Sequence, residues 1–371
     1  MGFIRNSVPN LERFKFFASS LKKIIERTPA SPGWELVWLV IINREAGGFT
    51  IKKRWKSHEN QMPFLVKEAE KNPLREKKTV PAQLNGPLAD YGAVFTEDGR
   101  RAGEITHEFI KEARENGVFY LIIVAGGDGA SRDVLLEVNK APDFFRNQSA
   151  ILRLPMGTGN DGADGVSLTE SLLRIIKKTN LAFNPALSLK TPEGRDFFAF
   201  NILSFGLDAF VTHMTNKMKS LLPYDSYKLW VDMAALFYDK IYKVGYTVLD
   251  AYNEAGAAVY HTKEKILFAA MGAGGGRSYG SGVRILPDER NVCVLKQAPL
   301  LRKIELKSLC KTGKHINEKE AVLFNACELR FFCDNPVLAQ MDGETVLLRP
   351  SSSPAVIKLF PGRIPVFSSP L

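Results

Sequence analysis

The 371-residue sequence predicts an α/β plus β fold, with an N-terminal three-layer α/β domain and a C-terminal antiparallel β-sandwich domain. In the first half, two short apolar runs, at 118–124 and 150–154, each end in a glycine-rich loop. Apolar runs of this length between turn residues are typical of buried parallel strands. In the second half, short β-prone runs follow one another with little helix between them, which favours an antiparallel sandwich.

The N-terminal segment, residues 1–33, carries an amphipathic basic helix. Its apolar residues recur at spacings of three and four, and basic residues surround them: Leu11, Phe14, Phe17, Leu21 and Ile24. Two interpretations fit this pattern. The apolar face packs on the main domain, or it docks on an anionic membrane surface.

The first domain begins with a core strand at 35–42, and Asn43 and Gly47 follow in a turn. A second strand is expected at 93–96, before a helix that ends near residue 115. Thr96 closes this strand and is suited to cap the helix that follows.

The two glycine-rich loops have the composition of a phosphate cradle. The first contains Gly126, Gly127, Asp128 and Gly129, and the second contains Gly157, Thr158, Gly159, Asn160 and Asp161. Parallel strands place both loops at one edge of the sheet. Glycines let backbone N–H groups approach a phosphate, and a helix expected at 131–140 adds its N-terminal dipole. An aspartate beside an anion indicates another task, such as orienting the loop or reaching a magnesium ion or a ribose hydroxyl.

Composition limits the partners. A net charge of +10 suits an anionic partner, and without a zinc-finger or RNA-binding signature we expect no nucleic acid. The four cysteines lack disulfide or metal spacing, which indicates free thiols and a cytoplasmic location. No apolar run is long enough to span a bilayer, so membrane contact is expected to be peripheral, on the inner face.

The pairing of GGDG with P-x-G-T-G-N-D about thirty residues later resembles the diacylglycerol kinase catalytic domain superfamily. That group contains bacterial lipid kinases, sphingosine kinases and, more distantly, NAD kinases and phosphofructokinases. The resemblance covers about residues 35–347 and includes a Gly-x-Asp-Ala turn at 206–209, a Tyr-Gly-x-Gly turn at 279–282 and an Asp-Gly-Glu at 342–344.

The resemblance implies an NAD kinase/phosphofructokinase-like first domain and ATP-dependent phosphorylation of a lipid hydroxyl with Mg²⁺. It implies that Asn43, Gly47, Thr96 and both loops contact the nucleotide. It also implies that Asp342 is the catalytic carboxylate, and that Glu344 beside it holds magnesium or tunes the Asp342 carboxylate. On this basis we expect four segments: an extension at 1–33, a nucleotide-binding domain at 34–165, a lipid-substrate domain at 166–348, and a C-terminal segment at 349–371 that returns to the first domain.

The sequence departs from the family pattern at two places. After the first loop the family continues Thr-x-x-Glu, whereas this chain has Ala130 and Asp133. The segment linked to a structural magnesium in bacterial members is shortened here around Asp288 and Glu289, so no metal ligands are assigned.

Three functions remain open: a kinase of a diacylglycerol- or sphingoid-like lipid, a kinase of a soluble substrate such as NAD, and a non-catalytic lipid or nucleotide sensor. The expected partner is a lipid substrate at a membrane surface. A sheet edge exposed in the second domain would permit a homodimer.

Overall fold

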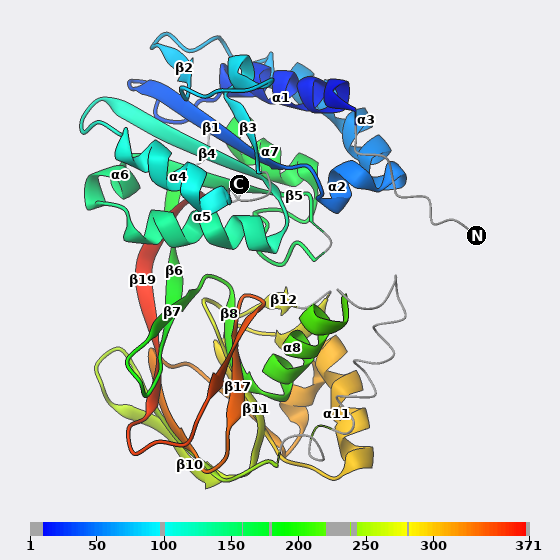
Figure 1. The fold of residues 1–371 in the computed structure, drawn as a ribbon, viewed down its shortest axis with the longest axis vertical. Coiled ribbons are helices and arrows are strands. Elements are labelled where there is room, and N and C mark those ends of the chain that lie inside the picture. Colours follow the sequence, from blue (N-terminus) through cyan, green and yellow to red (C-terminus); the bar gives the residue numbers. More distant parts are fainter. Residues whose placement is uncertain are drawn as a thin grey trace. The chain divides into compact units, whose positions relative to one another are not determined.

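The computed structural model describes residues 10–368, apart from 97–100, 158, 178–179, 220–237, 239–242 and 280–281. The chain forms two compact units (Figure 1). Unit 1 comprises Met1–Asn184 and Gly362–Leu371, and unit 2 comprises Pro185–Pro361. The fold class predicted from the sequence is confirmed, because unit 1 is built on a parallel sheet and unit 2 on antiparallel sheets.

The parallel sheet of unit 1 has β1 at its centre. Strand β4 pairs with β1 on one side and with β5 on the other, and β2 and β3 pair with successive stretches of β1. Every residue of β4 and β5 is buried, as expected for strands covered on both faces. The strands are β1 (Glu35–Asn43), β2 (Thr79–Pro81), β3 (Ala93–Thr96), β4 (Val118–Gly126) and β5 (Ser149–Pro155), and the last residues of β19 (Ala355–Phe367) pair with β5 at Val366.

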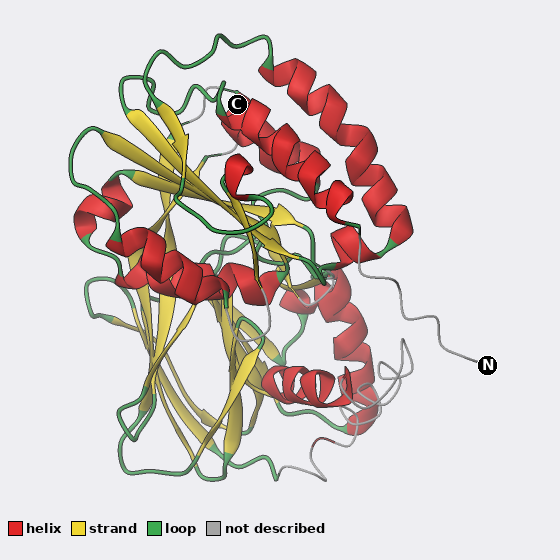
Figure 2. Ribbon diagram, turned by 45° about the horizontal axis from the view of Figure 1, so that its top comes forward, coloured by secondary structure: helices red, strands yellow, loops and turns green. Residues whose placement is uncertain are grey.

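Helices cover both faces of this sheet (Figure 2). One face carries α1 (Leu11–Ile25), α3 (Lys52–Ala69) and α7 (Leu168–Ile176), which pack against one another. The other carries α4 (Ala102–Lys111) and α5 (Asp128–Lys140). Short helical segments occupy the connections: α2 (Gly47–Thr50), η1 (Ala89–Tyr91) and α6 (Asp143–Asn147).

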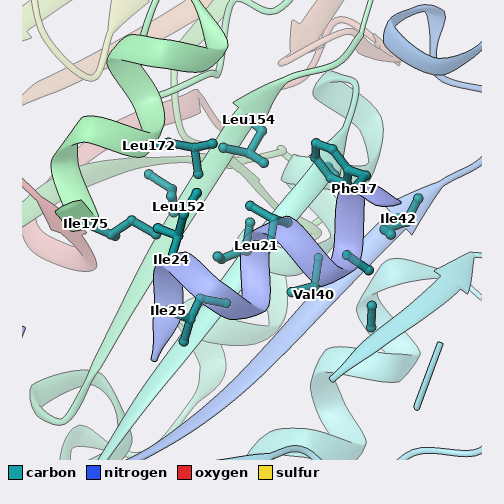
Figure 3. Packing of buried hydrophobic residues seen from close by; sticks show 14 of the residues in the cluster. Phe17, Leu21, Ile24, Ile25, Val40, Ile42, Leu152, Leu154, Leu172 and Ile175 are labelled. Carbon is teal, nitrogen blue, oxygen red and sulfur yellow. The ribbon is translucent and has the colours of Figure 1, made fainter. Parts of the chain in front are cut away.

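Helix α1 buries its apolar face in the core of unit 1. Figure 3 shows Phe17, Leu21 and Ile24 of α1 between residues of the sheet and of α7. All three side chains are fully buried. Four of the five residues of the stripe recognised in the sequence, Phe14, Phe17, Leu21 and Ile24, therefore form a packing surface and are not available to a membrane, whereas Leu11 is 37% exposed. No helix in the described parts of the chain is long and apolar enough to cross a membrane.

Unit 2 is a sandwich of antiparallel strands. One sheet has the order β15-β14-β11-β8-β17-β18, and the other pairs β10, β9, β16 and the start of β19. Phe205 of the first sheet stacks on Phe331 of the second, with ring centroids 4.1 Å apart. The strands are β6 (Leu181–Lys190), β7 (Asp196–Ala199), β8 (Ile202–Gly206), β9 (Thr247–Tyr252), β10 (Ala258–Glu264), β11 (Ile266–Gly272), β12 (Arg277–Tyr279), β13 (Val283–Leu286), β14 (Val292–Lys296), β15 (Ala321–Phe324), β16 (Glu328–Cys333), β17 (Val337–Met341) and β18 (Glu344–Leu348).

Two helices pack on the outer side of the six-stranded sheet: α8 (Leu207–Lys219) and α11 (Leu300–Thr312), the latter followed by η2 (Lys314–Asn317). Phe210 of α8 and Leu306 of α11 belong to one buried cluster with Phe268 and Leu295 of the sheet. The sequence also predicts a helix at 226–242, and that stretch lies almost wholly outside the described residues.

The expected division at 165/166 is wrong. The boundary lies between Asn184 and Pro185 because α7 belongs to unit 1. Leu172 and Ile175 of α7 are fully buried in the same core as α1. The boundary expected at 348/349 is also corrected, since the chain rejoins unit 1 only at Gly362.

Candidate functional site

The predicted nucleotide contacts of unit 1 gather at the carboxyl ends of four adjacent strands. Asn43, the last residue of β1, pairs in register with Thr96, the last residue of β3. On the other side, Gly126 at the end of β4 pairs with Pro155 at the end of β5. The register therefore brings the turn after β1 and both glycine-rich loops to one sheet edge, where open α/β sheets bind ligands.

Helix α5 begins inside the first loop. The sequence predicts a start at Ser131, but α5 starts at Asp128 with Gly127 as its N-cap. The first-turn N–H groups of a helix have no intrahelical acceptor and carry partial positive charge. The GGDG segment is thus both loop and helix N-terminus, an arrangement suited to a phosphate.

The two loops touch through glycines. A Cβ added to Gly157 would lie 2.5 Å from the Cα of Gly127, so position 157 does not accommodate a larger residue, whereas a Cβ on Gly127 would meet the Gly157 Cα at 3.4 Å. Asp128 completes the junction, because its Oδ1 accepts a hydrogen bond from the Gly162 N–H at 2.9 Å. Of the tasks considered for Asp128, the structure thus shows one, the orientation of the second loop.

Two features of Asn160 are typical of a ligand-binding site. Its backbone adopts a left-handed conformation with φ of 62°, which asparagine tolerates better than most residues. Its side-chain Oδ1 is buried and accepts no hydrogen bond from any described residue. A buried amide oxygen without a donor is uncommon, and a ligand hydroxyl or N–H would satisfy it. Thr158 lies outside the described residues.

The second loop is supported from behind by residues whose roles sequence patterns did not reveal. Arg54 donates a hydrogen bond to the Gly157 carbonyl at 2.8 Å, although it sits in a lysine-rich run typical of a solvated surface. Gly48 donates to the Met156 carbonyl at 2.7 Å. Below the loop, Arg153 and Asp164 form a buried ion pair at 2.6 Å. The loop is therefore held at both ends and beneath.

The turn after β1 is ordered by its own side chains. Asn43 Oδ1 accepts from the Glu45 N–H at 2.9 Å, and Gly47 begins α2. The guanidinium of Arg44 lies over the Phe95 ring, 4.9 Å from its centroid. Thr96 is not the cap of the following helix, since α4 begins at Ala102 with Arg101 as N-cap.

In unit 2, Asp342 occupies the hairpin turn between β17 and β18. Asp342 and Gly343 both have positive φ, 47° and 97°, as a two-residue type I′ turn requires. The carboxylate accepts hydrogen bonds from three consecutive backbone N–H groups at the start of β8: those of Phe200, Asn201 and Ile202. These donors fix the carboxylate in one orientation.

Helix α8 and Gln340 brace this turn. Gln340 accepts from the Gly343 N–H at 3.1 Å, and its Nε2 lies 3.4 Å from a carboxylate oxygen of Asp208. Asn216 of α8 donates to the Gly343 carbonyl at 2.7 Å. Burial raises the pKa of the Asp208 carboxyl, and hydrogen bonds from Ser204 and Gln340 oppose that rise.

Glu344 is exposed and is the first residue of β18, paired with Met341 across the hairpin. The described residues 271–279 of the glycine-rich segment reach the same neighbourhood within unit 2. The Tyr279 hydroxyl donates to the Gly274 carbonyl at 3.2 Å, and the Ala273 N–H donates to the Asn201 carbonyl at 2.9 Å. The Oδ1 of Asn201 is buried and has no hydrogen-bond partner among the described residues.

The segment that would hold a structural magnesium does not fit a metal. Arg290 donates from Nε to both carboxylate oxygens of Asp288 at 3.0 Å, and its Nη1 reaches the Leu323 carbonyl. This hydrogen bonding lowers the pKa of Asp288. The carboxylate oxygens that a metal would need are therefore engaged by a cation of the chain itself. Among the described residues there is no group of three or more His, Cys, Asp or Glu suited to bind a metal ion.

Comparison with known proteins finds similarity to lipid kinases. The model of the diacylglycerol kinase catalytic domain matches residues 37–184. A Bacillus subtilis (strain 168) protein named "Putative lipid kinase YtlR" is 22% identical over 306 residues, which cover 78% of this chain and 95% of that protein. An Alcanivorax borkumensis protein named "Probable lipid kinase YegS-like" is 26% identical over 192 residues, covering 50% of this chain and 56% of that protein.

Solved structures show the same fold. The crystal structure of a diacylglycerol kinase from Bacillus anthracis str. Sterne superimposes with a TM-score of 0.53 at 14% identity, covering 91% of this chain and 98% of that one. The resemblance drawn from the glycine-loop motifs is thus confirmed, because residues 37–184, which the family model matches, contain both glycine-rich loops.

Proposed function

We propose that this chain is an ATP-dependent lipid kinase that transfers the γ-phosphate of ATP to the hydroxyl of a diacylglycerol- or sphingoid-like lipid. The observation that carries the proposal is the contact of two glycine-rich loops at the end of one parallel sheet, with the Gly127 and Gly157 backbones touching. One loop opens a helix of thirteen residues, so N–H groups and a helix dipole converge on one place. Such an arrangement suits a nucleoside triphosphate.

In phosphoryl transfer the protein mainly positions groups and stabilises charge. The Gly126–Gly129 segment and the Gly157–Asp161 loop would bind the phosphates through backbone N–H groups. Asn43 and Thr96, at the ends of β1 and β3, would contact the rest of the nucleotide. Mg²⁺ would enter with ATP and neutralise phosphate charge.

The alcohol of the lipid must lose its proton as it attacks, and we assign this task to Asp342. Its carboxylate is held in a fixed orientation by backbone N–H groups of Asn201 and Ile202, at 3.1 and 2.9 Å. Glu344 is exposed two residues away and would tune that carboxylate or contact the nucleotide's metal.

The test is an assay with γ-labelled ATP and three acceptors: a lipid extract in neutral detergent, NAD, and no acceptor. The proposal expects label in the lipid phase and none in NAD. Label in NAD would favour a soluble-substrate kinase, and ATP binding by calorimetry without transfer to any lipid would favour a sensor. Identification of the labelled lipid by mass spectrometry would then establish whether a glycerolipid or a sphingoid base is the substrate.

A further inference from the structure

Helix α11 of unit 2 presents exposed aliphatic side chains on its surface. Leu300, Leu301 and Ile304 at its N-terminal end are 45%, 81% and 46% exposed. The opposite side of the helix is anchored, because Leu306 and Cys310 are buried against the six-stranded sheet. The exposed leucines and isoleucine therefore lie on a firmly held helix.

Lysines continue the same surface. Spacings of four, three and four residues place Leu300, Ile304, Lys307 and Lys311 along one side of the helix. Lys307 and Lys311 are exposed, and so is Lys314 just beyond the helix end. The surface formed by Leu300, Leu301, Ile304, Lys307, Lys311 and Lys314, here named the α11 face, is aliphatic at one end and basic at the other.

Three glutamates in α11 and just after η2 are engaged by one arginine of the helix. Arg302 lies 2.7 Å from a carboxylate oxygen of Glu305 and 2.8 Å from one of Glu320, and it also pairs with Glu318. These ion pairs raise the pKa of Arg302, which therefore stays charged. Together with Lys307, Lys311 and Lys314, this arginine makes four basic groups against the three glutamates, so the formal charge of this part of the surface is positive.

We propose that the α11 face docks on a bilayer that contains anionic phospholipid. Aliphatic side chains beside lysines match the boundary between acyl chains and negatively charged head groups, because lysines reach the head groups while leucines enter the apolar layer. The proposal rests on the proposed lipid kinase function in one respect. Docking would bring unit 2 to a substrate that resides in a membrane.

The test is co-sedimentation of the full chain with vesicles, without nucleotide. Vesicles of phosphatidylcholine alone are compared with phosphatidylcholine vesicles that contain phosphatidylglycerol. Wild type should bind the anionic vesicles and be released by salt. Lys307→Glu/Lys311→Glu should lower binding by about tenfold or more, and Leu301→Asp by a similar factor.

Strand β10 provides matched controls in the same unit. Val259 is 42% exposed and Lys263 is exposed, so Val259→Asp and Lys263→Glu repeat the chemical changes on another surface. Both should bind vesicles like wild type. Equal binding by wild type and the α11 variants, or an equal loss in the β10 variants, would overturn the proposal. So would a change in oligomeric state of Leu301→Asp by light scattering with unchanged vesicle binding.

Kinase activity towards lipid in neutral detergent separates this proposal from the proposed function. Variants of α11 that keep this activity but lose vesicle binding support docking. If wild type binds anionic vesicles but phosphorylates no lipid in detergent, docking stands and the kinase proposal fails.

Discussion

Asp128 Oδ1 accepts a hydrogen bond from the Gly162 N–H at 2.9 Å, which ties the first turn of α5 to the end of the second glycine-rich loop. The two residues are far apart in sequence and follow different strands. Their hydrogen bond joins the two glycine-rich loops to each other. This role explains why an aspartate lies in a segment otherwise suited to bind phosphate. The Asp128 carboxylate orients the second glycine-rich loop.

Replacing this carboxylate tests that role. Asp128→Ala should lower the free energy of unfolding by about 1–2 kcal/mol, since the Gly162 N–H loses its acceptor, and should weaken ATP binding. Asp128→Asn retains Oδ1 and should keep most of the stability. Urea unfolding and calorimetric titration with ATP measure both effects. Equal stability of Asp128→Ala and wild type would show that the hydrogen bond does not hold the loops together.

The contact between the loops predicts opposite effects for two glycine substitutions. In Gly157→Ala the new methyl group would meet the Gly127 Cα at 2.5 Å, so the loops must separate, at a cost of about 1–3 kcal/mol. In Gly129→Ala the Cβ meets nothing within 4 Å and lies in the first turn of a helix, so stability should be unchanged or rise by up to about 1 kcal/mol. Thermal unfolding of the two proteins distinguishes them, and a reversed order would contradict the described geometry.

The ion pair between Arg290 and Asp288 predicts that the folded chain has no structural requirement for magnesium. Without nucleotide, a chelator or added Mg²⁺ should shift the unfolding midpoint by less than about 2 °C. Arg290→Ala should cost only about 1 kcal/mol, because both side chains are more than a third exposed. A loss of many degrees on chelation would show that a metal site exists despite the arginine.

Acid should destabilise the protein through His315. This residue is fully buried, and its Nε2 lies 3.0 Å from the Ile285 carbonyl. Burial lowers its pKa in the folded chain, while the unfolded chain keeps a value of about 6.5. The unfolded state therefore binds the proton more readily, and stability is lost as pH falls below about 6.5.

The slope of unfolding free energy against pH in that window should approach about 1.4 kcal/mol per unit for one such group. His315→Gln can still donate to the Ile285 carbonyl and should flatten the slope. Part of the slope should remain, because burial and the nearby Arg54 also lower the pKa of His58. Urea unfolding between acid and neutral pH measures it, and identical slopes in variant and wild type would exclude His315 as the cause.

Much of unit 1 could be predicted from sequence, because its strands are continuous apolar runs and its loops contain glycine. The strands at 35–42, 93–96, 118–124 and 150–154 and the meeting of their loops are all present. The start of α5 was missed by three residues because glycine and aspartate are poor helix formers. The unit boundary was missed because the sequence of α7 would have the same helical pattern whichever unit the helix packs on.

Unit 2 was less predictable, since its contacts are long-range. Nothing in the sequence around Asp342 shows that its carboxylate meets N–H groups 140 positions earlier, as it does at Ile202. Gln340 and Arg54 carried no signal either, because a single buried glutamine or a half-buried arginine resembles any surface residue. The exposed aliphatic residues of α11 likewise became visible only when the opposite side of that helix was seen to be buried.

The most direct test of the proposed function is single-turnover transfer of γ-phosphate from ATP to lipid in neutral detergent by wild type and Asp342→Asn. The proposal predicts transfer by wild type and a loss of at least about a hundredfold in the variant, with ATP affinity unchanged. Thermal unfolding of the variant must also be measured. In the variant an amide group would lie against the backbone N–H donors that bond to the Asp342 carboxylate in wild type. Glu344→Gln, at an exposed position, should be affected less. Transfer at the wild-type rate by folded Asp342→Asn would remove Asp342 from catalysis, and no transfer by wild type to any lipid would contradict the proposed function itself.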